Sequence, residues 1–189
     1  MSNVRHQLET LAQTLIQRSG VRDLSFRRLA DQTGIKSSSV HYHFPEKNDL
    51  TAALITAYSA AFLARLRAID NSDTTLRRKL LAFVDVFAEA GADDKLCLCG
   101  MLAAELTSLD GACRTLLEAF FRSAEAWLVG VFKRHQDELA TSLPARQLAA
   151  VVMSGLEGAL LLDRVHGSAH HLQAQRQLIT GFAPGRRTA

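Results

Sequence analysis

Residues 25–50 of the chain read SFRRLADQTGIKSSSVHYHFPEKNDL. The pattern predicts two short helices joined by a tight turn, and a third helix that begins at Pro45, a residue type favoured in the first turn of a helix. Ser25 is suited to cap the first short helix, and Gly34 supplies the backbone freedom that a turn between two helices needs. This arrangement is a helix-turn-helix.

The second short helix of this stretch is predicted over residues 37–44. Val40 and Phe44 are four residues apart and therefore share one face of that helix. Polar side chains point away from this face, from Ser38, Ser39, His41 and Tyr42. A helix-turn-helix places such a polar edge in the major groove of DNA, where hydroxyl, imidazole and phenol groups reach base edges and phosphates.

The composition indicates a folded protein of one domain or two small ones. Of its 189 residues, 48% are hydrophobic and only three are proline, which allows a sizeable core. A formal charge of +3 and a pI near 9.0 permit a nucleic-acid partner. The sequence has no signal-type N-terminus and no apolar run of about 18 residues, so we expect a cytoplasmic protein with no membrane partner. We expect the three cysteines to be reduced thiols.

Helical periodicity continues on both sides of the opening stretch. Residues 4–18 form a first helix, and the helix after Pro45 continues over about residues 46–69, on the order of 36 Å, long enough to connect two bodies. Further helices are predicted over about residues 76–91, 96–109, 112–138, 145–165 and 168–182. No segment is typical of a strand. The sequence therefore predicts an all-α fold of about nine helices, with a three-helix head (residues 1–47) and a larger helical domain (residues 48–189).

The residues of the head resemble the DNA-binding head of the tetracycline-repressor (TetR) family of bacterial transcriptional regulators. The resemblance covers about residues 4–55, and the matching residues are Leu29-Ala30, Gly34-Ile35, Tyr42-His43-Phe44, Lys47 and Leu50. The later segment LEGALLLDRV (residues 156–165) is similar to the penultimate helix of the family, which in relatives builds a four-helix interface between two subunits. The resemblance thus implies a homodimer through the helices of about residues 145–182.

The resemblance also implies which head residues contact double-stranded operator DNA. Ser25 corresponds to a phosphate contact and Lys47 to a phosphate clamp. Apart from the resemblance, we interpret Arg27 and Arg28 as divided between surface salt bridges and phosphate contact, and we assign Arg27 to phosphate. The other positions lie on or beside the second short helix and face the groove or the DNA backbone: Lys36, Ser37, Ser38, Ser39, His41 and Tyr42. Lys36 stands where relatives often have a capping serine, His41 replaces an aromatic hydroxyl, and Glu46 replaces a small capping residue. His43 lies on the core side and is expected to be structural.

A ligand cavity in the larger domain is a further implication of the resemblance. The large apolar residues of this domain are expected first of all to form the core, and in relatives the equivalent helices also enclose a small-molecule effector. The candidates are Phe62, Phe83, Phe87, Met101, Phe120, Phe121 and Trp127. Glu105 and Glu157 each interrupt an apolar stretch, so they are the groups expected to orient a ligand. Either carboxylate can instead face solvent or the dimer seam.

The cysteines and histidines do not predict a metal site or a cofactor. Cys97 and Cys99 are two positions apart on a helix and project about 200° from each other, so they cannot chelate one ion there. We interpret them as small buried hydrophobic residues. Cys113 lies elsewhere in the sequence, and the three thiols together offer an alternative role in redox sensing. His166, His170 and His171 are interpreted as a solvated helix junction.

The sequence therefore predicts a DNA-binding transcriptional regulator, most simply a repressor that leaves its operator when a small molecule binds. Two alternatives stay open on the same fold, a thiol-based redox or electrophile sensor and a helical ligand carrier that does not bind DNA. We do not expect an enzyme, since the sequence contains no Gly-rich phosphate loop, nucleophile elbow or metal-ligand motif.

Overall fold

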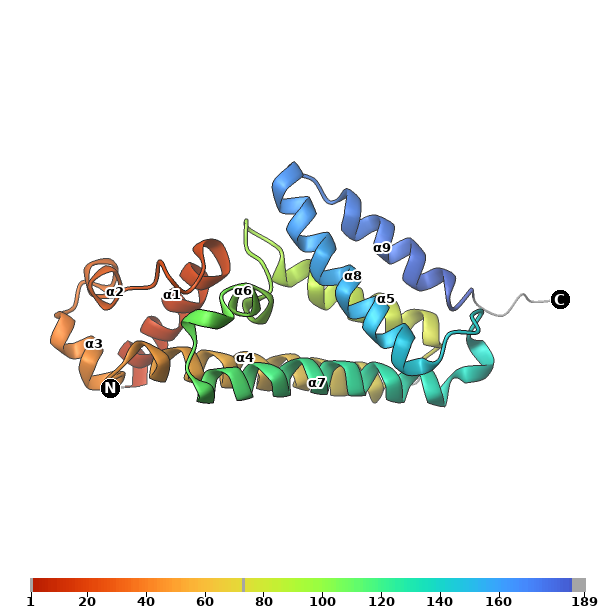
Figure 1. The fold of residues 1–189 in the computed structure, drawn as a ribbon, viewed down its shortest axis with the longest axis horizontal. Coiled ribbons are helices and arrows are strands. Elements are labelled where there is room, and N and C mark those ends of the chain that lie inside the picture. Colours follow the sequence, from red (N-terminus) through yellow and green to blue (C-terminus); the bar gives the residue numbers. More distant parts are fainter. Residues whose placement is uncertain (1, 73, 185–189) are drawn as a thin grey trace. The chain divides into compact units, whose positions relative to one another are not determined.

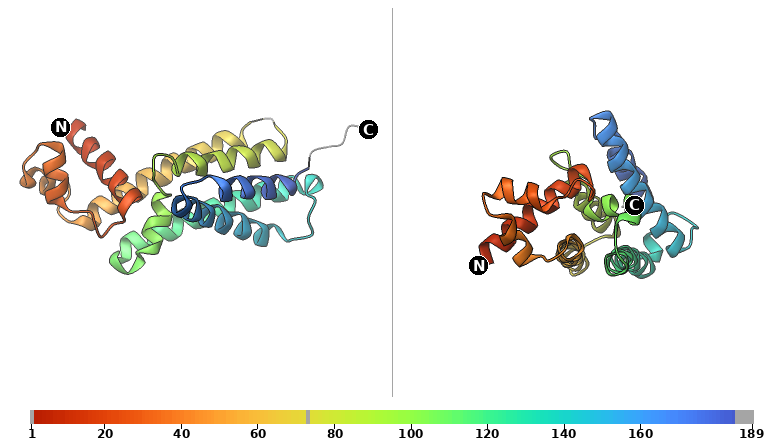
Figure 2. Two further views of the ribbon diagram at one scale, coloured as in Figure 1. Left: turned by 90° about the horizontal axis from the view of Figure 1, so that it is seen from above. Right: turned by 60° about the vertical axis from the view of Figure 1, so that its left-hand side comes forward.

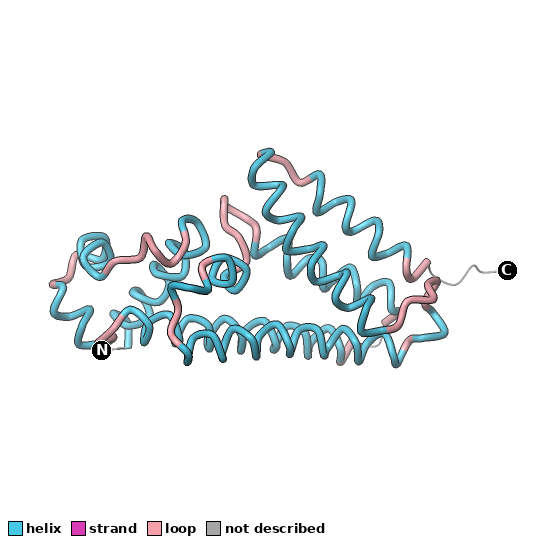
Figure 3. Tube along the Cα trace, viewed as in Figure 1, coloured by secondary structure: helices cyan, strands magenta, loops and turns pink. Residues whose placement is uncertain are grey.

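The computed structural model describes residues 2–72 and 74–184 of the chain. Within these residues all regular structure is helical, with nine α-helices, two 3₁₀ turns and no strand (Figures 1 and 3). The prediction of an all-α fold of about nine helices is confirmed. The elements are α1 (Ser2–Ser19), α2 (Phe26–Thr33), α3 (Ser37–His43), α4 (Lys47–Asp70), α5 (Leu76–Ala90), α6 (Leu98–Ala104), η1 (Leu106–Ser108), α7 (Gly111–Arg134), η2 (Gln136–Glu138), α8 (Ala145–His166) and α9 (His170–Gly181).

By packing, the chain divides into two compact units. The first unit comprises Met1–Ala60 and Lys95–Phe120, and the second comprises Ala61–Asp94 and Phe121–Ala189. Two of the three division points fall inside long helices, α4 and α7, which each contribute residues to both units. The third, after Asp94, falls in the segment between α5 and α6. The segment that holds α6 thus packs in the same unit as the predicted three-helix head. The predicted boundary between a DNA-binding head (residues 1–47) and a ligand-binding and dimerisation domain (residues 48–189) stays a prediction.

The predicted turn between two short helices is present in the first unit. The hydroxyl of Ser25 accepts a hydrogen bond of 3.1 Å from the backbone N–H of Arg28, so this residue is the N-cap of α2. Gly34 ends α2 in the left-handed region, with φ 70° and ψ 22°. The helix α3 begins after Lys36, whose side chain makes no capping hydrogen bond. The helix α2 therefore begins and ends at the two residues that predicted its bounds, whereas α3 begins without a side-chain cap.

The core of the first unit anchors α3 by the face that the sequence predicted. Val40 and Phe44 are 0% and 1% exposed. Their burial accompanies the packing of α3 on α2 and of α2 on α1. The guanidinium of Arg5 lies 4.7 Å from the centre of the Phe44 ring and adds a cation–π contact from α1. Other buried side chains of this core are Leu8, Ala12, Ile16, Leu24, Leu29 and Leu50.

The helix α6 packs against α1 in the same unit. Sequence periodicity predicted one helix over residues 96–109, but the structure has α6 and the short turn η1. The reason is visible at both ends. The backbone N–H of Leu96 donates to the carbonyl of Gln17 (3.0 Å), whose side-chain amide donates back to the carbonyl of Leu96 (2.9 Å). At the other end, Glu105 has φ −112° and ψ 31°, outside the helical region.

In the second unit, α5, α8 and α9 pack on one another, and α9 lies beside α8 (Figures 1 and 2). The side chain of the buried Lys79 of α5 binds backbone carbonyls at the C-terminal end of α4. Its ammonium group donates to the carbonyls of Ile69, Asp70 and Ser72 at 3.2, 2.7 and 2.9 Å. One cation thereby binds three carbonyls at and just beyond the C-terminus of α4 and complements the helix dipole.

The turn between α8 and α9 is held by a buried carboxylate. Asp163 accepts the backbone N–H groups of His171 and Leu172, each at 2.8 Å, and the Nδ1–H of His171 at 2.9 Å. Burial acts to raise the pKa of Asp163, but the hydrogen bonds from Leu172 and His171 outweigh it, so the pKa lies below its usual range. The His166 and His171 rings stack with centroids 5.3 Å apart. Among the residues that the structure describes, no group of three His, Cys, Asp or Glu side chains has the geometry of a metal site.

One described helix, α4, is long and apolar enough by length and composition alone to cross a membrane. Its larger apolar side chains do not form a continuous outer surface. Leu50, Leu54 and Ile55 are buried in the first unit, and Phe62 and Leu66 are buried in the second. The apolar character of α4 is therefore used in protein cores.

Candidate functional site

The polar edge of α3 lies at the surface of the first unit. Ser37, Ser38, His41 and Tyr42 are exposed and Ser39 is half-buried. The Tyr42 side chain is 73% exposed. Because Val40 fixes the opposite side of the helix, these groups are presented outwards on a rigid element. Such an arrangement allows hydroxyl and aromatic groups to reach base edges and phosphates.

The His41 ring has a defined orientation although it is exposed. Its Nδ1–H donates to the carbonyl of Pro45 at 3.2 Å, and its ring meets the ring of Phe26 edge to face with centroids 4.9 Å apart. These two contacts hold the ring in place from both α2 and the segment before α4. His43 is half-buried and packs against the Tyr42 ring with centroids 5.3 Å apart.

Three cationic side chains lie on the elements next to α3 in the chain. Arg27 and Lys36 are exposed on α2 and in front of α3. Lys47 is half-buried at the start of α4, and its Nζ lies 3.5 Å from the carbonyl of Arg22. Burial lowers the pKa of Lys47, against the opposing effect of the Glu105 and Asp23 carboxylates. The hydroxyl of Ser25 accepts its capping hydrogen bond and keeps its own proton as a donor.

Glu105 interrupts an apolar stretch of the sequence, and in the structure its carboxylate binds backbone groups of its own unit. Its carboxylate faces the loop between α1 and α2, where Oε2 accepts the backbone N–H groups of Val21 at 2.5 Å and Arg22 at 3.1 Å. A Cβ on Gly20 would lie 2.6 Å from Oε1, so the approach requires glycine at this position, which also has a φ of +87°. The guanidinium Nε of Arg22 donates to Ser108 at 3.2 Å. We refer to these contacts of Glu105 with Val21 and Arg22 as the Glu105 clasp.

Most of the aromatic residues predicted to surround a ligand pack against one another. Phe62, Phe83 and Phe87 form a cluster in the second unit with centroid distances of 5.3 to 6.4 Å. Trp127 stacks on Phe83 at 5.3 Å with an interplanar angle of 19°. In the first unit, Phe120 packs on Tyr58 at 5.8 Å, and Met101 is half-buried in α6. These residues form cores, and a role for them in ligand binding stays a prediction.

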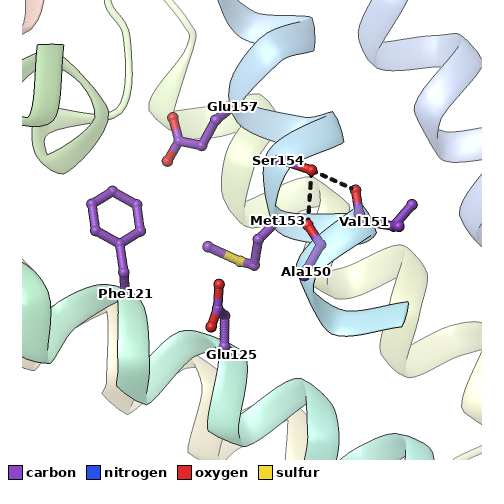
Figure 4. A pocket seen from close by; sticks show the side chains of 7 residues that line it. All are labelled: Phe121, Glu125, Ala150, Val151, Met153, Ser154 and Glu157. Carbon is purple, nitrogen blue, oxygen red and sulfur yellow. Dashed lines mark hydrogen bonds between the residues drawn. The ribbon is translucent and has the colours of Figure 1, made fainter. Parts of the chain in front are cut away.

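A pocket of about 410 Å³ lies in the second unit between α7 and α8 (Figure 4). It contains two of the predicted ligand residues, Phe121 and Glu157. The sequence reasoning missed Glu125 and Met153, although Glu125 follows Phe121 by four positions and therefore shares its helix face. The complete lining is Phe121, Glu125, Ala150, Val151, Met153, Ser154 and Glu157.

Apolar side chains of α8 and α9 remain at the surface of the second unit. Val165 is 79% exposed and Leu161 is 53% exposed. Together with Val151, Leu162 and Leu178, each more than 40% exposed, they form what we call the α8–α9 face. Exposed groups of this kind mark interaction surfaces when they gather on adjacent helices.

The small residues of α8 lie on two sides of the helix that differ in what covers them. Ala159 is buried, and a Cβ on Gly155 would lie 2.5 Å from the side-chain oxygen of Gln175, so this glycine allows α9 of the same chain to approach. Ser154 is exposed, and a Cβ on Gly158 would meet no described atom within 4 Å. Small residues four positions apart on a helix allow another helix to approach closely, within one chain or between two. The Gly155 side of α8 is used within the chain, and the Ser154 side is open.

The three cysteines are buried thiols. The Tyr58 hydroxyl donates to Cys97 Sγ at 3.7 Å, and Cys113 Sγ donates to the carbonyl of Asn48 at 3.5 Å. Burial raises the pKa of the Cys113 thiol to about 12, and the nearby Asp110 carboxylate contributes to the rise. A thiol with a raised pKa is mostly protonated at neutral pH and is a poor nucleophile.

Comparison with known proteins matches both parts of the chain to regulators. Residues 10–54 match the family described as bacterial regulatory proteins, tetR family. Residues 76–177 match the C-terminal domain of transcriptional regulators of the LmrA/YxaF-like type. Among characterised proteins, the nucleoid occlusion factor SlmA of Vibrio campbellii is 26% identical over 158 residues, which cover 81% of this chain and 79% of that protein.

Solved structures give the same result over nearly the whole chain. A TetR transcriptional regulator from Legionella pneumophila is 30% identical, with a TM-score of 0.86 and coverage of 96% of this chain and 97% of that one. A TetR-family regulator from Agrobacterium tumefaciens is 28% identical, with a TM-score of 0.90 and coverage of 96% and 98%. A family match that spans more than half of the sequence, together with this full-length relative from Legionella, shows that the chain belongs to the TetR family of bacterial transcriptional regulators.

Proposed function

We propose that this TetR-family regulator is a ligand-responsive repressor that binds operator DNA as a homodimer and releases it when a small molecule binds its C-terminal region. The exposed edge of α3 carries the DNA-binding part of the proposal. Tyr42, His41 and Ser38 project from a helix whose opposite side is fixed by the fully buried Val40. Arg27 and Lys36 add positive charge beside this edge, where phosphates lie when a recognition helix occupies the major groove.

The α8–α9 face supports a homodimer. Two helix-turn-helix heads must present their recognition helices about 34–36 Å apart to reach successive major grooves, and a two-fold dimer achieves this geometry. Leu161, Leu162 and Val165 are exposed on the same helix as Ser154 and Gly158, two small residues that allow a second helix to approach. A second copy of the chain, packed on this face helix against helix, buries these apolar groups.

Ligand response requires that binding in the second unit changes the DNA-binding unit. Two features support this part of the proposal. The helices α4 and α7 are continuous from one unit into the other. Within the first unit, the Glu105 clasp links the end of α6 to the loop that precedes α2. A ligand that converts an almost wholly DNA-competent protein into an almost wholly incompetent one must prefer the second state by about 5.5 kcal/mol.

Two other roles on the same fold are less well supported. A thiol sensor requires a reactive cysteine, whereas Cys97, Cys99 and Cys113 are all buried. A role as a nucleoid occlusion factor is suggested by the name of relatives that match 81–84% of this chain at 26–27% identity. This role shares DNA binding with the repressor and needs no effector. TetR-family regulators are in general not enzymes, and we place the protein in the cytoplasm.

The proposed function is tested by DNA binding at several salt concentrations. The full chain is titrated into fluorescent duplexes from the region upstream of its own gene, and anisotropy is measured with unlabelled random duplex as competitor. We expect specific binding whose logarithmic affinity falls linearly with the logarithm of salt, since phosphate contacts release counterions. Absence of binding to any duplex at low salt contradicts the proposal. Binding that no small molecule reverses contradicts its ligand-responsive part only.

A further inference from the structure

The pocket between α7 and α8 has a lining with a definite chemical character. Figure 4 shows the side chains of Phe121, Glu125, Met153 and Glu157 directed toward a common space, with Val151 pointing away from it. The two carboxylates come from different helices, Glu125 from α7 and Glu157 from α8. At about 410 Å³ the pocket lies within the range of small-molecule sites.

The polar part of this lining carries negative charge. Among the seven lining residues there are two carboxylates and no lysine, arginine or histidine. The third polar residue, Ser154, donates its hydroxyl to the carbonyl of Ala150 at 2.8 Å, so its proton is used within the helix. An anionic ligand placed here meets like charge on both walls, which disfavours it.

The apolar part of the lining suits a cation with an organic body. Phe121 contributes an aromatic ring, and the electron-rich face of such a ring attracts cations, quaternary ammonium groups included. The thioether of Met153 is polarisable and adapts to ligands of different shape. A carboxylate, an aromatic ring and a thioether around one hollow therefore match a positively charged nitrogen attached to apolar groups.

The charges next to the pocket decide where the cation sits. A neighbouring pocket of about 380 Å³ is lined by Arg122, Arg146 and Glu125, so Glu125 borders both hollows. Two guanidinium groups thus line the hollow on that side of Glu125 and disfavour a cation there. Glu157 does not line the neighbouring pocket, and it faces Phe121 and Met153 across the first one (Figure 4). The cation is thus expected between Glu157 and Phe121.

We propose that this pocket binds an organic cation, a quaternary or protonated amine with an apolar or aromatic body, through Glu157, Glu125, Phe121 and Met153. The statement that such a cation is the effector rests on the proposed ligand-responsive function. The statement that the pocket binds such a cation does not depend on that function. The rim residue Val151 also belongs to the α8–α9 face, so a ligand in this pocket lies next to the surface expected to form the dimer.

The proposal is tested by calorimetric titration of the full chain with benzyltrimethylammonium as the probe cation. N,N-dimethylbenzamide, a neutral molecule of similar size, and benzenesulfonate, an anion, are the ligand controls at constant ionic strength. The test variants are Glu157→Gln and Glu125→Gln, which keep side-chain shape and remove charge. Asp137→Asn is the matched control, because Asp137 is an exposed carboxylate of η2 that does not line the pocket.

We expect the cation to bind at least about tenfold more tightly than the amide, and the sulfonate more weakly than either. Glu157→Gln is expected to raise the dissociation constant of the cation about tenfold and that of the amide less than about twofold. Asp137→Asn is expected to change neither. Equal affinities for cation and amide, or equal losses of both ligands in Glu157→Gln, overturn the proposal. If Glu157→Gln does not fold, the same comparison in Glu125→Gln decides, with a smaller expected loss.

DNA anisotropy, measured separately with an equal addition of sodium chloride as the salt control, distinguishes this proposal from the proposed function. Cation binding with unchanged DNA binding supports the site and overturns ligand-responsive repression by this class of effector. DNA binding without any cation binding overturns the site and leaves the DNA-binding function in place. Cation binding that also releases DNA supports both.

Discussion

Glu105 Oε2 lies 2.5 Å from the backbone nitrogen of Val21, 84 residues away in the sequence. The carboxylate also accepts the N–H of Arg22 at 3.1 Å, so two donors of the loop between α1 and α2 depend on one side chain of the α6–η1 junction. A carboxylate that accepts two backbone N–H groups makes charge-assisted hydrogen bonds, which are stronger than neutral ones. The position of α6 and the entry into the helix-turn-helix are thereby linked within the first unit.

Removal of this carboxylate is expected to destabilise the protein. We predict that Glu105→Ala lowers the free energy of unfolding by about 1.5–3 kcal/mol, because two backbone donors lose a charged partner. Glu9→Ala is the control, since Glu9 makes a surface pair with Arg5 at 3.0 Å, and such pairs contribute about 0–1 kcal/mol. Urea unfolding followed by circular dichroism measures both. Equal effects of the two substitutions contradict a structural role of the clasp.

Glycine is predicted to be favoured between α2 and α3 because of its left-handed backbone conformation and not because a side chain would clash there. Gly34 has a φ of +70°, and a Cβ added at this position would meet no described atom within 4 Å. Gly34→Ala is therefore expected to cost about 1 kcal/mol through backbone strain alone. In contrast, Gly130 lies inside α7 and has no left-handed φ, so Gly130→Ala is expected to be neutral or to stabilise by up to about 1 kcal/mol. Urea unfolding measures the change in the free energy of unfolding for both variants. A loss of equal size in both contradicts the prediction.

Phosphate contacts and base contacts are predicted to differ in their salt dependence. Lys36→Gln is expected to reduce the slope of log affinity against log salt by about one unit, because one charge fewer displaces counterions. Tyr42→Phe removes a hydroxyl without a charge and is expected to lower affinity about threefold to tenfold with the slope unchanged. Since both side chains are exposed, unfolding stability should stay within about 0.5 kcal/mol. An unchanged slope in Lys36→Gln removes that residue from the phosphate contacts.

The buried thiols are predicted to be unreactive in the folded protein. The pKa of Cys113 rises from 9.0 to about 12, so at about pH 8 its thiolate fraction is about a thousandfold smaller than in the unfolded chain. Reaction with a chromogenic disulfide reagent is expected to be slow in buffer and fast in urea. The unfolded state loses this thiol proton above about pH 9 while the folded state keeps it, so stability should fall as pH rises from about 9 to about 12. Fast labelling of Cys113 in the folded protein contradicts the prediction and revives the thiol-sensor alternative.

A charge in the α8–α9 face is predicted to separate the dimer. Leu161 is 53% exposed in the single chain, so Leu161→Glu is expected to fold normally and to place a carboxylate in the proposed interface. A buried unpaired charge costs several kcal/mol, which shifts the dimer dissociation constant by more than about a hundredfold. Sedimentation velocity of the variant and of an exposed control outside the face, Thr115→Glu, measures the difference. A dimeric Leu161→Glu protein places the interface elsewhere.

The features that the sequence predicted are those that depend on residues close together in the sequence. Ser25 caps α2, Gly34 turns the chain, and Val40 and Phe44 are buried on one side of α3. Each follows from the conformation of a few consecutive residues or from an i, i+4 spacing that any α-helix imposes. Polar side chains opposite Val40 are exposed for the same reason, so the candidate DNA-binding edge was predictable almost completely.

The roles of the acidic residues were not predictable in this way. Glu105 and Glu157 both interrupt apolar stretches, yet one accepts hydrogen bonds from the loop after α1 and the other lines a pocket with Phe121. Glu125 and Met153, which complete that pocket, carry no signal beyond their helix faces. Spacing determines which side chains share a face but contains no information on the element that this face meets.

The sequence by itself determined the all-α architecture, the helix-turn-helix and the outward direction of the α3 edge, because local backbone conformation and helical period decide all three. Only the tertiary structure decided that Gly155 faces α9 while Ser154 stays open, that Glu105 holds the loop before α2, and that two carboxylates converge on Phe121. These relationships join residues far apart in the chain. They depend on how helices pack, and many packings are compatible with the same pattern of apolar faces.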